Sequence, residues 1–460
     1  MKNGLYFDVS LTTFVNALLK AFPVERLHTG WVLRDASGHL SFIAGSTLSD
    51  DERSQAKKHV KKAMSEYCRD NCILDVSQPG VGRLVESAHS FNETVYCSDG
   101  GKNFAVVARL IDRRIVGHDW LIQPASGWQP PEPARIVFAS LKGGVGRSTA
   151  LAVIATDLAL QGRKVLAIDL DLEAPGIGTM LLGQSEQPRF GVLDWFVERG
   201  IHGANFDDNQ FLLEMQASSP FALSKGLIHV VPAVGATSDK YPNNVLAKIA
   251  RAYLELPQED GHSLSFLVQT QDLIQRLSVL TRYDAILIDA RAGLNESTAA
   301  ALLGLGADVM LFGIDTPQTF ASYRYLLAHL ARFARNEDDD WLYRLRMVHA
   351  KASRDTDQQA AFRDRAYDIF KEFLYRDAPL RDENGNVITN ESGEPSAKIE
   401  FGLTDPTAPH YAWTVLSDGN FAEFDPFTKD TQLKSEFYRE AYTGIIEGIG
   451  ELLENAEENT

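Results

Sequence analysis

The sequence is poor in cysteine, and the few that it has indicate neither disulfides nor a metal site. Cys68, Cys72 and Cys97 are the three cysteines among 460 residues. An odd number of cysteines gathered in the first hundred residues is neither a disulfide framework nor a four-ligand zinc set. We therefore expect ordinary reduced thiols at these positions.

Long apolar runs are also missing. No stretch approaches the roughly 20 apolar residues that a membrane-spanning helix needs. The first ten residues, MKNGLYFDVS, lack the basic segment, the apolar stretch and the small-residue cleavage site of an export signal. A hydrophobic content of 44% with 23% charged residues is that of a globular protein. We expect a cytoplasmic protein without a membrane partner.

Basic residues are in deficit, with 45 Lys and Arg against 62 Asp and Glu and a net charge of −17. The excess of acidic over basic residues is greatest in residues 371–460, which hold 7 basic and 19 acidic side chains. Nucleic acids and anionic lipids bind basic surfaces, so the charge opposes both kinds of partner. A helix carrying Lys57, Lys58, Lys61 and Lys62 offers a local basic patch, although a solvated helix face explains these lysines as well.

A proline-rich stretch divides the chain. Four prolines stand within eleven residues in QPASGWQPPEP, so residues 123–134 are predicted to form a stiff linker. Residues 1–122 before it read as a small α+β domain whose ligand the sequence does not reveal. Strands are expected in 31–44, 94–97 and 104–111, and a helix over 49–68, where Ser49 begins a capping pattern.

After the linker, short apolar runs alternate with segments of helical length. This pattern indicates parallel strands buried on both faces by crossover helices, so residues 135–375 are predicted to be a doubly wound, mostly parallel α/β domain. Residues 376–460 form an acidic extension, irregular over 380–430, with a closing helix over about 435–455. The expected strands are 136–141, 165–170, 285–289, 309–314 and 345–350, and the expected helices are 148–161, 265–280, 296–305 and 318–335.

The strongest local signal is a glycine-rich loop between the first of these strands and the helix after it. It reads LKGGVGRST over residues 141–149. Glycines let the backbone wrap a phosphate with its N–H groups, and the N-terminus of the following helix favours negative charge. The usual pattern G-x-x-x-x-G-K-[ST] is broken twice, by Leu141 at the first glycine and by Arg147 at the lysine.

The loop resembles the deviant Walker A sequence, K-G-G-x-G-K-[ST]-[ST], of the ParA/MinD family of ATPases. Two further segments are similar to that family in order and spacing. Asp169-Leu-Asp171 ends the second strand, with Pro175-Gly176 shortly after it, and Asp289 ends an apolar strand near 120 residues downstream. The resemblance covers roughly residues 135–350 and implies a P-loop ATPase fold that binds ATP and Mg²⁺.

The resemblance also implies a role for each matching residue. The loop backbone would hold the phosphates, the Ser148 hydroxyl would bind Mg²⁺, and Asp289 would do so through water, with Asp169 supporting the metal shell. Asp171 would orient the attacking water, and Lys142 would reach across an ATP-dependent homodimer to the partner's phosphates. The residues expected at the nucleotide are Lys142, Gly143, Gly144, Val145, Gly146, Arg147, Ser148, Thr149 and Pro317.

Two positions depart from the family pattern. Arg147 keeps the charge of the P-loop lysine but is larger and forked, which predicts binding through its phosphate contacts with slow hydrolysis, or else a harmless substitution. Val348-His349-Ala350 stands where the family commonly has an adenine-contacting asparagine, so adenine and guanine are not distinguished by sequence.

The predicted function is a Mg²⁺-dependent, slow ATPase that works as a dimeric switch and recruits or releases a protein partner. The alternatives are a scaffold that binds nucleotide without turnover, a DNA-partition ATPase, and a bacterial-type tyrosine kinase, which usually has a C-terminal tyrosine cluster that is lacking here. The closing helix is expected to dock on the protein's own core through Phe437, Ile445, Ile449 and Leu452. Arg291, His410 and Trp413 are expected to pair or pack rather than bind a ligand.

Overall fold

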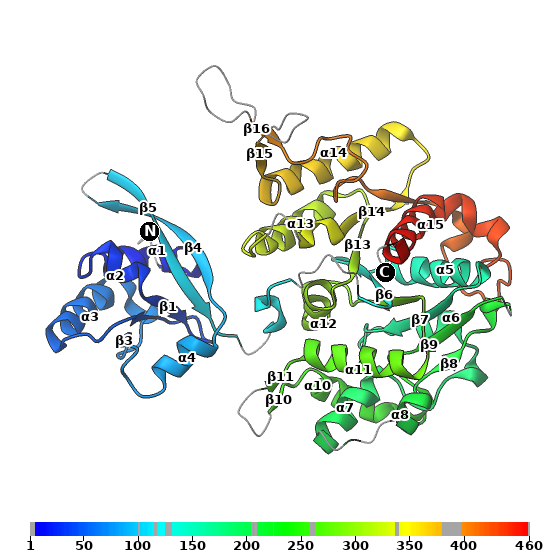
Figure 1. Cartoon of the computed structure of the whole chain (residues 1–460), viewed down its shortest axis with the longest axis horizontal. Coiled ribbons are helices and arrows are strands. Elements are labelled where there is room, and N and C mark those ends of the chain that lie inside the picture. The colour runs from blue at the N-terminus through cyan, green and yellow to red at the C-terminus, as the bar shows by residue number, and fades with distance from the viewer. Residues whose placement is uncertain are drawn as a thin grey trace. The chain divides into compact units, whose positions relative to one another are not determined.

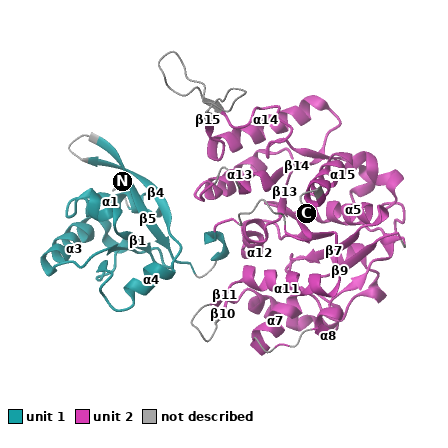
Figure 2. Cartoon of the chain, viewed as in Figure 1, with its two compact units in different colours: residues 1–122 teal, residues 123–460 magenta. Residues whose placement is uncertain are grey.

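The computed structural model divides the chain into two compact units, Met1–Ile122 and Gln123–Thr460 (Figure 1, Figure 2). It describes residues 5–99, 102–114, 117–124, 131–203, 206, 209–223, 225–257, 263–335, 340–379 and 397–458. Most of the predicted linker, residues 125–130, lies outside this range, as do residues 380–396 of the predicted irregular region. Among the described residues, no helix is long and apolar enough to cross a membrane.

The first unit is a five-stranded mixed sheet with helices. The strand order is β3-β2-β1-β5-β4, in which β1 pairs parallel with β5 and β2 with β3, and the other two pairs are antiparallel. Its elements are α1 (Phe7–Leu18), α2 (Val24–His28), β1 (Trp31–Arg34), β2 (Leu40–Ala44), α3 (Asp50–Met64), β3 (Ile73–Asp75), α4 (Val81–Ser87), β4 (Phe91–Asp99) and β5 (Lys102–Asp112).

The core of this unit lies between the sheet and helices α1 and α3. Phe14 and Leu18 of α1 and Val60 of α3 are buried there, with the free thiols Cys68, Cys72 and Cys97. Helix α3 begins where the sequence predicts. The Ser49 hydroxyl accepts from the Glu52 N–H at 3.2 Å, and the Glu52 carboxylate accepts from the Ser49 N–H at 2.8 Å. Helices α1, α2 and α4 were not predicted.

The second unit is built on an eight-stranded sheet in the order β17-β14-β13-β6-β12-β7-β9-β8. All neighbouring pairs are parallel except β8 with β9. The strands are β6 (Ala134–Ser140), β7 (Lys164–Asp169), β8 (Ala217–Ser218), β9 (Leu227–Val231), β12 (Ala285–Asp289), β13 (Asp308–Gly313), β14 (Leu345–Ala352) and β17 (Trp413–Leu416). The predicted mostly parallel α/β fold, preceded by a smaller α+β unit, is therefore confirmed.

Helices cover both faces of this sheet, which explains why its central strands are apolar throughout. Helices α5 and α15 share one core with β6, β12 and β13, and α11 to α14 lie on the other face (Figure 1). The α-helices are α5 (Arg147–Leu160), α6 (Ile177–Leu181), α7 (Val192–His202), α8 (Asn209–Leu213), α9 (Ala236–Lys240), α10 (Val245–Ala252), α11 (Phe266–Leu280), α12 (Glu296–Ala299), α13 (Pro317–Leu330), α14 (Thr356–Phe373) and α15 (Ser435–Glu458).

Two stretches differ from the expected pattern. The helix predicted over 296–305 is α12 followed by a π-helical turn, Ala300–Gly304. Among its described residues, the region between β7 and α11 contains helices α6 to α10, strands β8 and β9 and the hairpin β10 (Leu256–Pro257) and β11 (Ser263–Leu264), none of which was predicted. A second small hairpin, β15 (Asp377–Pro379) and β16 (Ala397–Ile399), lies at the start of the acidic extension.

Helix α15 docks on the protein's own core, as predicted, although with a different set of side chains. Tyr438, Ile445, Ile449 and Leu453 are buried, and the Tyr438 hydroxyl donates to Asp157 Oδ1 on α5 at 2.8 Å. The choice of Phe437 was wrong, since Phe437 is 40% exposed, whereas Leu452 is partly buried and packs against the core as expected. Phe437 lies one residue, about 100° of helical turn, away from the buried Tyr438.

Candidate functional site

Three neighbouring strand ends bring the candidate side chains together. Strand β12 lies between β6 and β7, and all three run parallel, so their carboxyl ends meet at one edge of the sheet. In this register Asp289 stands beside Asp169. Ser140 ends β6 at the same edge. This is the position at which open α/β sheets bind ligands.

The glycine-rich loop connects β6 to α5 at that edge. Gly144 and Gly146 adopt φ angles of +73° and +91°, which side chains rarely adopt. A methyl group placed on Gly143, Gly144 or Gly146 would meet no other atom within 4 Å, so the loop has open space around it. Together with the N-terminus of the 14-residue helix α5, this backbone suits a bound phosphate.

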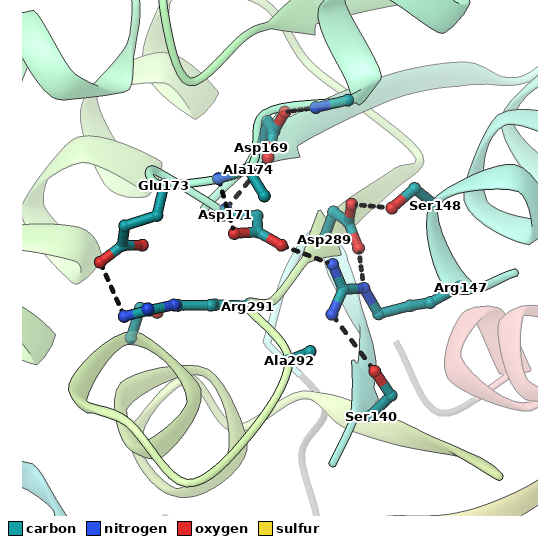
Figure 3. A network of polar contacts seen from close by, with 12 residues as sticks. Ser140, Arg147, Ser148, Asp169, Asp171, Glu173, Ala174, Asp289, Arg291 and Ala292 are labelled. Atoms are coloured by element: carbon teal, nitrogen blue, oxygen red, sulfur yellow. Dashed lines mark hydrogen bonds and ion pairs between the residues drawn. The ribbon is translucent and has the colours of Figure 1, made fainter. Parts of the chain in front are cut away.

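The side chain of Arg147 points into the carboxylates at the strand ends (Figure 3). Its Nε donates to Asp289 Oδ1, one terminal nitrogen donates to Asp171 Oδ2 at 2.9 Å, and the other donates to Ser140 Oγ at 3.3 Å. The Arg147 side chain is 8% exposed. The sequence expectation placed this guanidinium on a phosphate; in the structure it bridges β6, β12 and the segment after β7.

The same carboxylates accept from other groups as well. Ser148 Oγ donates to the second oxygen of Asp289 at 2.5 Å. Asp169 accepts from the backbone N–H groups of Asp171, Gly176 and Ile177 at 3.0 to 3.1 Å. Asp169 therefore holds the D-x-D segment and the Pro175-Gly176 loop in shape.

Burial governs the charge state of these groups. It raises the pKa of Asp169 to about 7, with a further contribution from the nearby Asp289 charge, and the three backbone N–H groups counter this rise. Burial also raises the pKa of Asp289, while the Arg147 guanidinium acts in the opposite direction. The pKa of Arg147 is raised, because the two carboxylates outweigh its desolvation.

Two lysines lie at the loop, and only one was predicted. Lys142 is exposed and its Nζ donates to Gln318 Oε1 at 3.1 Å, next to the exposed Pro317 at the start of α13. Lys351, at the end of β14, donates to the Gly144 carbonyl at 2.8 Å and has a φ of +53°. A non-glycine residue in this conformation is uncommon and often marks a functional site. The sequence signal that could have identified Lys351 was its position directly after the predicted strand that ends in Val348-His349-Ala350.

His349 does not lie at the loop. Its ring stacks on Phe362 of α14 with the centroids 4.0 Å apart, and it is 3% exposed. Burial lowers the pKa of His349 to about 4, so the imidazole is neutral.

The remaining sequence candidates pair or pack, as predicted. Arg291 donates to Glu173 at 2.7 Å beside the carboxylates (Figure 3). His410 is fully buried and its Nδ1 lies 2.7 Å from the Tyr375 hydroxyl. Trp413 packs partly buried against the core under α15.

The site suits a phosphate better than a free metal ion. The open glycine loop offers backbone donors, whereas every oxygen of Asp169, Asp171 and Asp289 already accepts a hydrogen bond within the chain, including Asp171 Oδ1 from the Ala174 N–H at 3.2 Å. Among the described residues, no group of three or more His, Cys, Asp or Glu side chains is arranged to hold a metal ion. With Arg147 in this position, the residues do not fit Mg²⁺.

Comparisons with known proteins agree with this geometry. Residues 136–281 match the family profile described as CobQ/CobB/MinD/ParA nucleotide binding domain. The chain is also 27% identical over 159 residues to an iron-sulfur cluster carrier protein of Pseudomonas fragi, which is 34% of this chain and 53% of that protein. The chain thus spans about half the length of this relative.

Solved structures of other proteins resemble this chain with low sequence identity and low TM-scores. A ParA family ATPase from Chlorobium tepidum has 17% identity and a TM-score of 0.41, covering 68% of this chain and 98% of its own. The MinD cell division protein of Aquifex aeolicus has 16% identity and a TM-score of 0.38, covering 70% and 96%. Over residues 136–281, which contain the glycine-rich loop and the strand-end Asp169, the chain is therefore similar to the nucleotide-binding domains of the CobQ/CobB/MinD/ParA family.

Proposed function

We propose that the second unit is an ATP-binding switch that hydrolyses ATP slowly, forms an ATP-dependent homodimer, and recruits or releases a protein partner. The observation that carries this proposal is the open glycine loop at the start of α5, next to the ends of β7 and β12. The family profile that matches residues 136–281 is that of a nucleotide-binding domain, which supports the proposal.

Each side chain has a role that its position supports. The backbone from Gly143 to Ser148 binds the phosphates, with Thr149 beside them. Asp171, at the loop edge, orients the attacking water once Arg147 releases it. Ser148 and Asp289, supported by Asp169, would hold Mg²⁺ only together with a nucleotide, when the phosphates give Arg147 another partner, and the ion would then neutralise phosphate charge.

The exposed position of Lys142 supports a role between subunits. Its Nζ reaches only Gln318, a neutral side chain, so little electrostatic energy holds it in place. A partner's phosphates offer a stronger, charge-assisted interaction. Dimer formation and nucleotide binding would then depend on each other.

Two other functions have less support. DNA partition requires basic contacts, which a net charge of −17 disfavours, so salt-sensitive binding of duplex DNA would favour that alternative. Cluster carriage, suggested by the name of the matching relative, needs thiolate ligands. All three cysteines lie before residue 123, so the nucleotide-binding unit has none.

Nucleotide binding tests the proposal directly. We expect wild type to bind a fluorescent ATP analogue saturably, and Gly146→Val to lose at least about tenfold in affinity, because valine resists a φ of +91°. Gly402→Ala is the matched control, since Gly402 is exposed and a methyl group there meets no atom within 4 Å. Absence of binding by wild type would refute the proposed function.

A further inference from the structure

Arg147 is the cation around which the carboxylates of the site gather. Asp169, Asp171 and Asp289 are all buried at one edge of the sheet. Arg147 forms ion pairs with Asp171 and Asp289, and its own exposure is 7%. The nearby Lys142 and Lys351 donate to Gln318 and to the Gly144 carbonyl instead.

The shape of the guanidinium matters as much as its charge. Its three nitrogen atoms donate to three segments at once: Asp289 ends β12, Asp171 follows β7, and Ser140 ends β6 (Figure 3). A lysine ammonium is compact and lacks this planar fork, so a lysine would not reproduce the three-way bridge. The substitution of the family's lysine therefore changes how the strand ends are held together.

Each carboxylate oxygen of the three aspartates already accepts at least one hydrogen bond within the chain. Asp289 accepts from Arg147 and Ser148, and Asp171 accepts from Arg147 and the Ala174 N–H. Both oxygens of Asp169 accept from backbone N–H groups. A metal ion could bridge Asp171 and Asp289 only by displacing the buried, charge-assisted contacts of Arg147 with both carboxylates.

We propose that Arg147 is the resident cation of this site: in the nucleotide-free protein its guanidinium takes the place of a divalent cation between Asp171 and Asp289 and excludes metal ions. The inference rests on the proposed function, because it concerns the same site. A metal ion binds only together with a nucleotide, whose phosphates offer the guanidinium other partners. Arg147 is thus a positioning residue that holds Asp171 until nucleotide arrives.

Manganese binding to the nucleotide-free full chain tests this exclusion. The loss of the free Mn²⁺ signal in electron paramagnetic resonance would be measured for wild type, Arg147→Gln and Arg147→Lys, with thermal unfolding in the presence and absence of Mg²⁺. Arg291→Gln is the matched control, because it removes a neighbouring arginine that pairs with Glu173 outside the cluster.

We expect wild type and Arg291→Gln to bind no Mn²⁺ at concentrations below about 1 mM. Above that concentration, exposed carboxylates bind divalent cations weakly in any protein. Arg147→Gln should bind one Mn²⁺ and show a melting temperature that Mg²⁺ raises, and Arg147→Lys should lie between the two. If Arg147→Gln does not fold without metal, rescue of folding by Mg²⁺ is the supporting result.

Two results would overturn the inference. Tight Mn²⁺ binding by nucleotide-free wild type would show that the guanidinium does not exclude metal. Absence of both Mn²⁺ binding and Mg²⁺ rescue in Arg147→Gln would show that the position of Arg147 is not a cation position. Binding of the fluorescent ATP analogue by wild type, measured in parallel, separates either result from failure of the proposed function.

Discussion

At the residue scale, the side-chain position of Arg147 determines which contacts the carboxylates of the site make. Sequence spacing correctly identified the loop and the strand-end aspartates, because glycines, apolar strands and their order are written in the sequence. It did not foresee that Arg147 would turn toward Asp171 and Asp289, because the direction of a side chain depends on which charges the fold brings near it. Lys351 was missed for the same reason, since only folding brings it to Gly144.

The contact between Arg147 and Asp171 predicts slow turnover. The guanidinium competes for the carboxylate that we propose orients water, and misplacement by about 1 Å can cost roughly a hundredfold in rate. We expect Arg147→Lys to hydrolyse ATP faster than wild type, and Asp171→Asn to lose turnover while still binding ATP. Phosphate release and nucleotide affinity would be measured for both.

Glu173→Gln serves as the control for Asp171→Asn, because Glu173 pairs with Arg291 and makes no contact with Arg147 in the described residues. It should keep at least about half of the wild-type rate, because Glu173 pairs with Arg291 and Tyr253 and not with the Arg147 cluster. Wild-type turnover by Asp171→Asn would refute the role given to Asp171. A slower Arg147→Lys would show that arginine assists hydrolysis.

His349 predicts a pH dependence of stability. Its pKa is about 4 in the folded protein, chiefly because it is buried, with Asp315 raising it and Arg365 lowering it, against about 6.5 when unfolded. The stabilisation that the neutral imidazole contributes is therefore complete above pH 6.5. It is lost as the pH falls toward 4, and the loss amounts to about 2 kcal/mol at pH 5. His349→Leu should show a correspondingly smaller loss between pH 7 and pH 5 in urea unfolding. Equal losses in the two proteins would contradict this.

At the scale of elements, long periodic segments were predictable and short ones were not. The strands β6, β7, β12, β13 and β14 and the helices α5, α11 and α13 lie close to their expected bounds, because each buries a regular apolar pattern. Helices α6, α8 and α9 have five residues each, too few for a periodic pattern. Their positions depend on contacts with the rest of the unit.

Helix α15 offers a test of core packing. Ile449 is fully buried, so Ile449→Ala should lower the free energy of unfolding by about 2 to 5 kcal/mol. Phe437→Ala, at a side chain that is 40% exposed, should cost less than about 1 kcal/mol. Chemical denaturation of both variants makes the comparison. Similar losses would mean that the helix packs through another face.

At the scale of the whole molecule, two compact units are joined in one acidic chain. The second unit contains the glycine loop that we propose binds nucleotide, and the first has a core of its own with no assigned ligand. The net charge of −17 favours a protein partner over nucleic acid or anionic lipid. The switch that we propose would therefore act through protein surfaces, and a change of oligomeric state would be its most direct sign.

Light scattering of the full chain with Mg²⁺ and a non-hydrolysable ATP analogue measures that change. We predict a mass near 50.9 kDa without nucleotide and twice that value with it. Lys142→Ala should remain monomeric while binding the analogue, whereas Gln318→Ala, which removes only the neutral partner of Lys142, should dimerise like wild type. A wild-type protein that binds the analogue and stays monomeric at saturation would contradict the account.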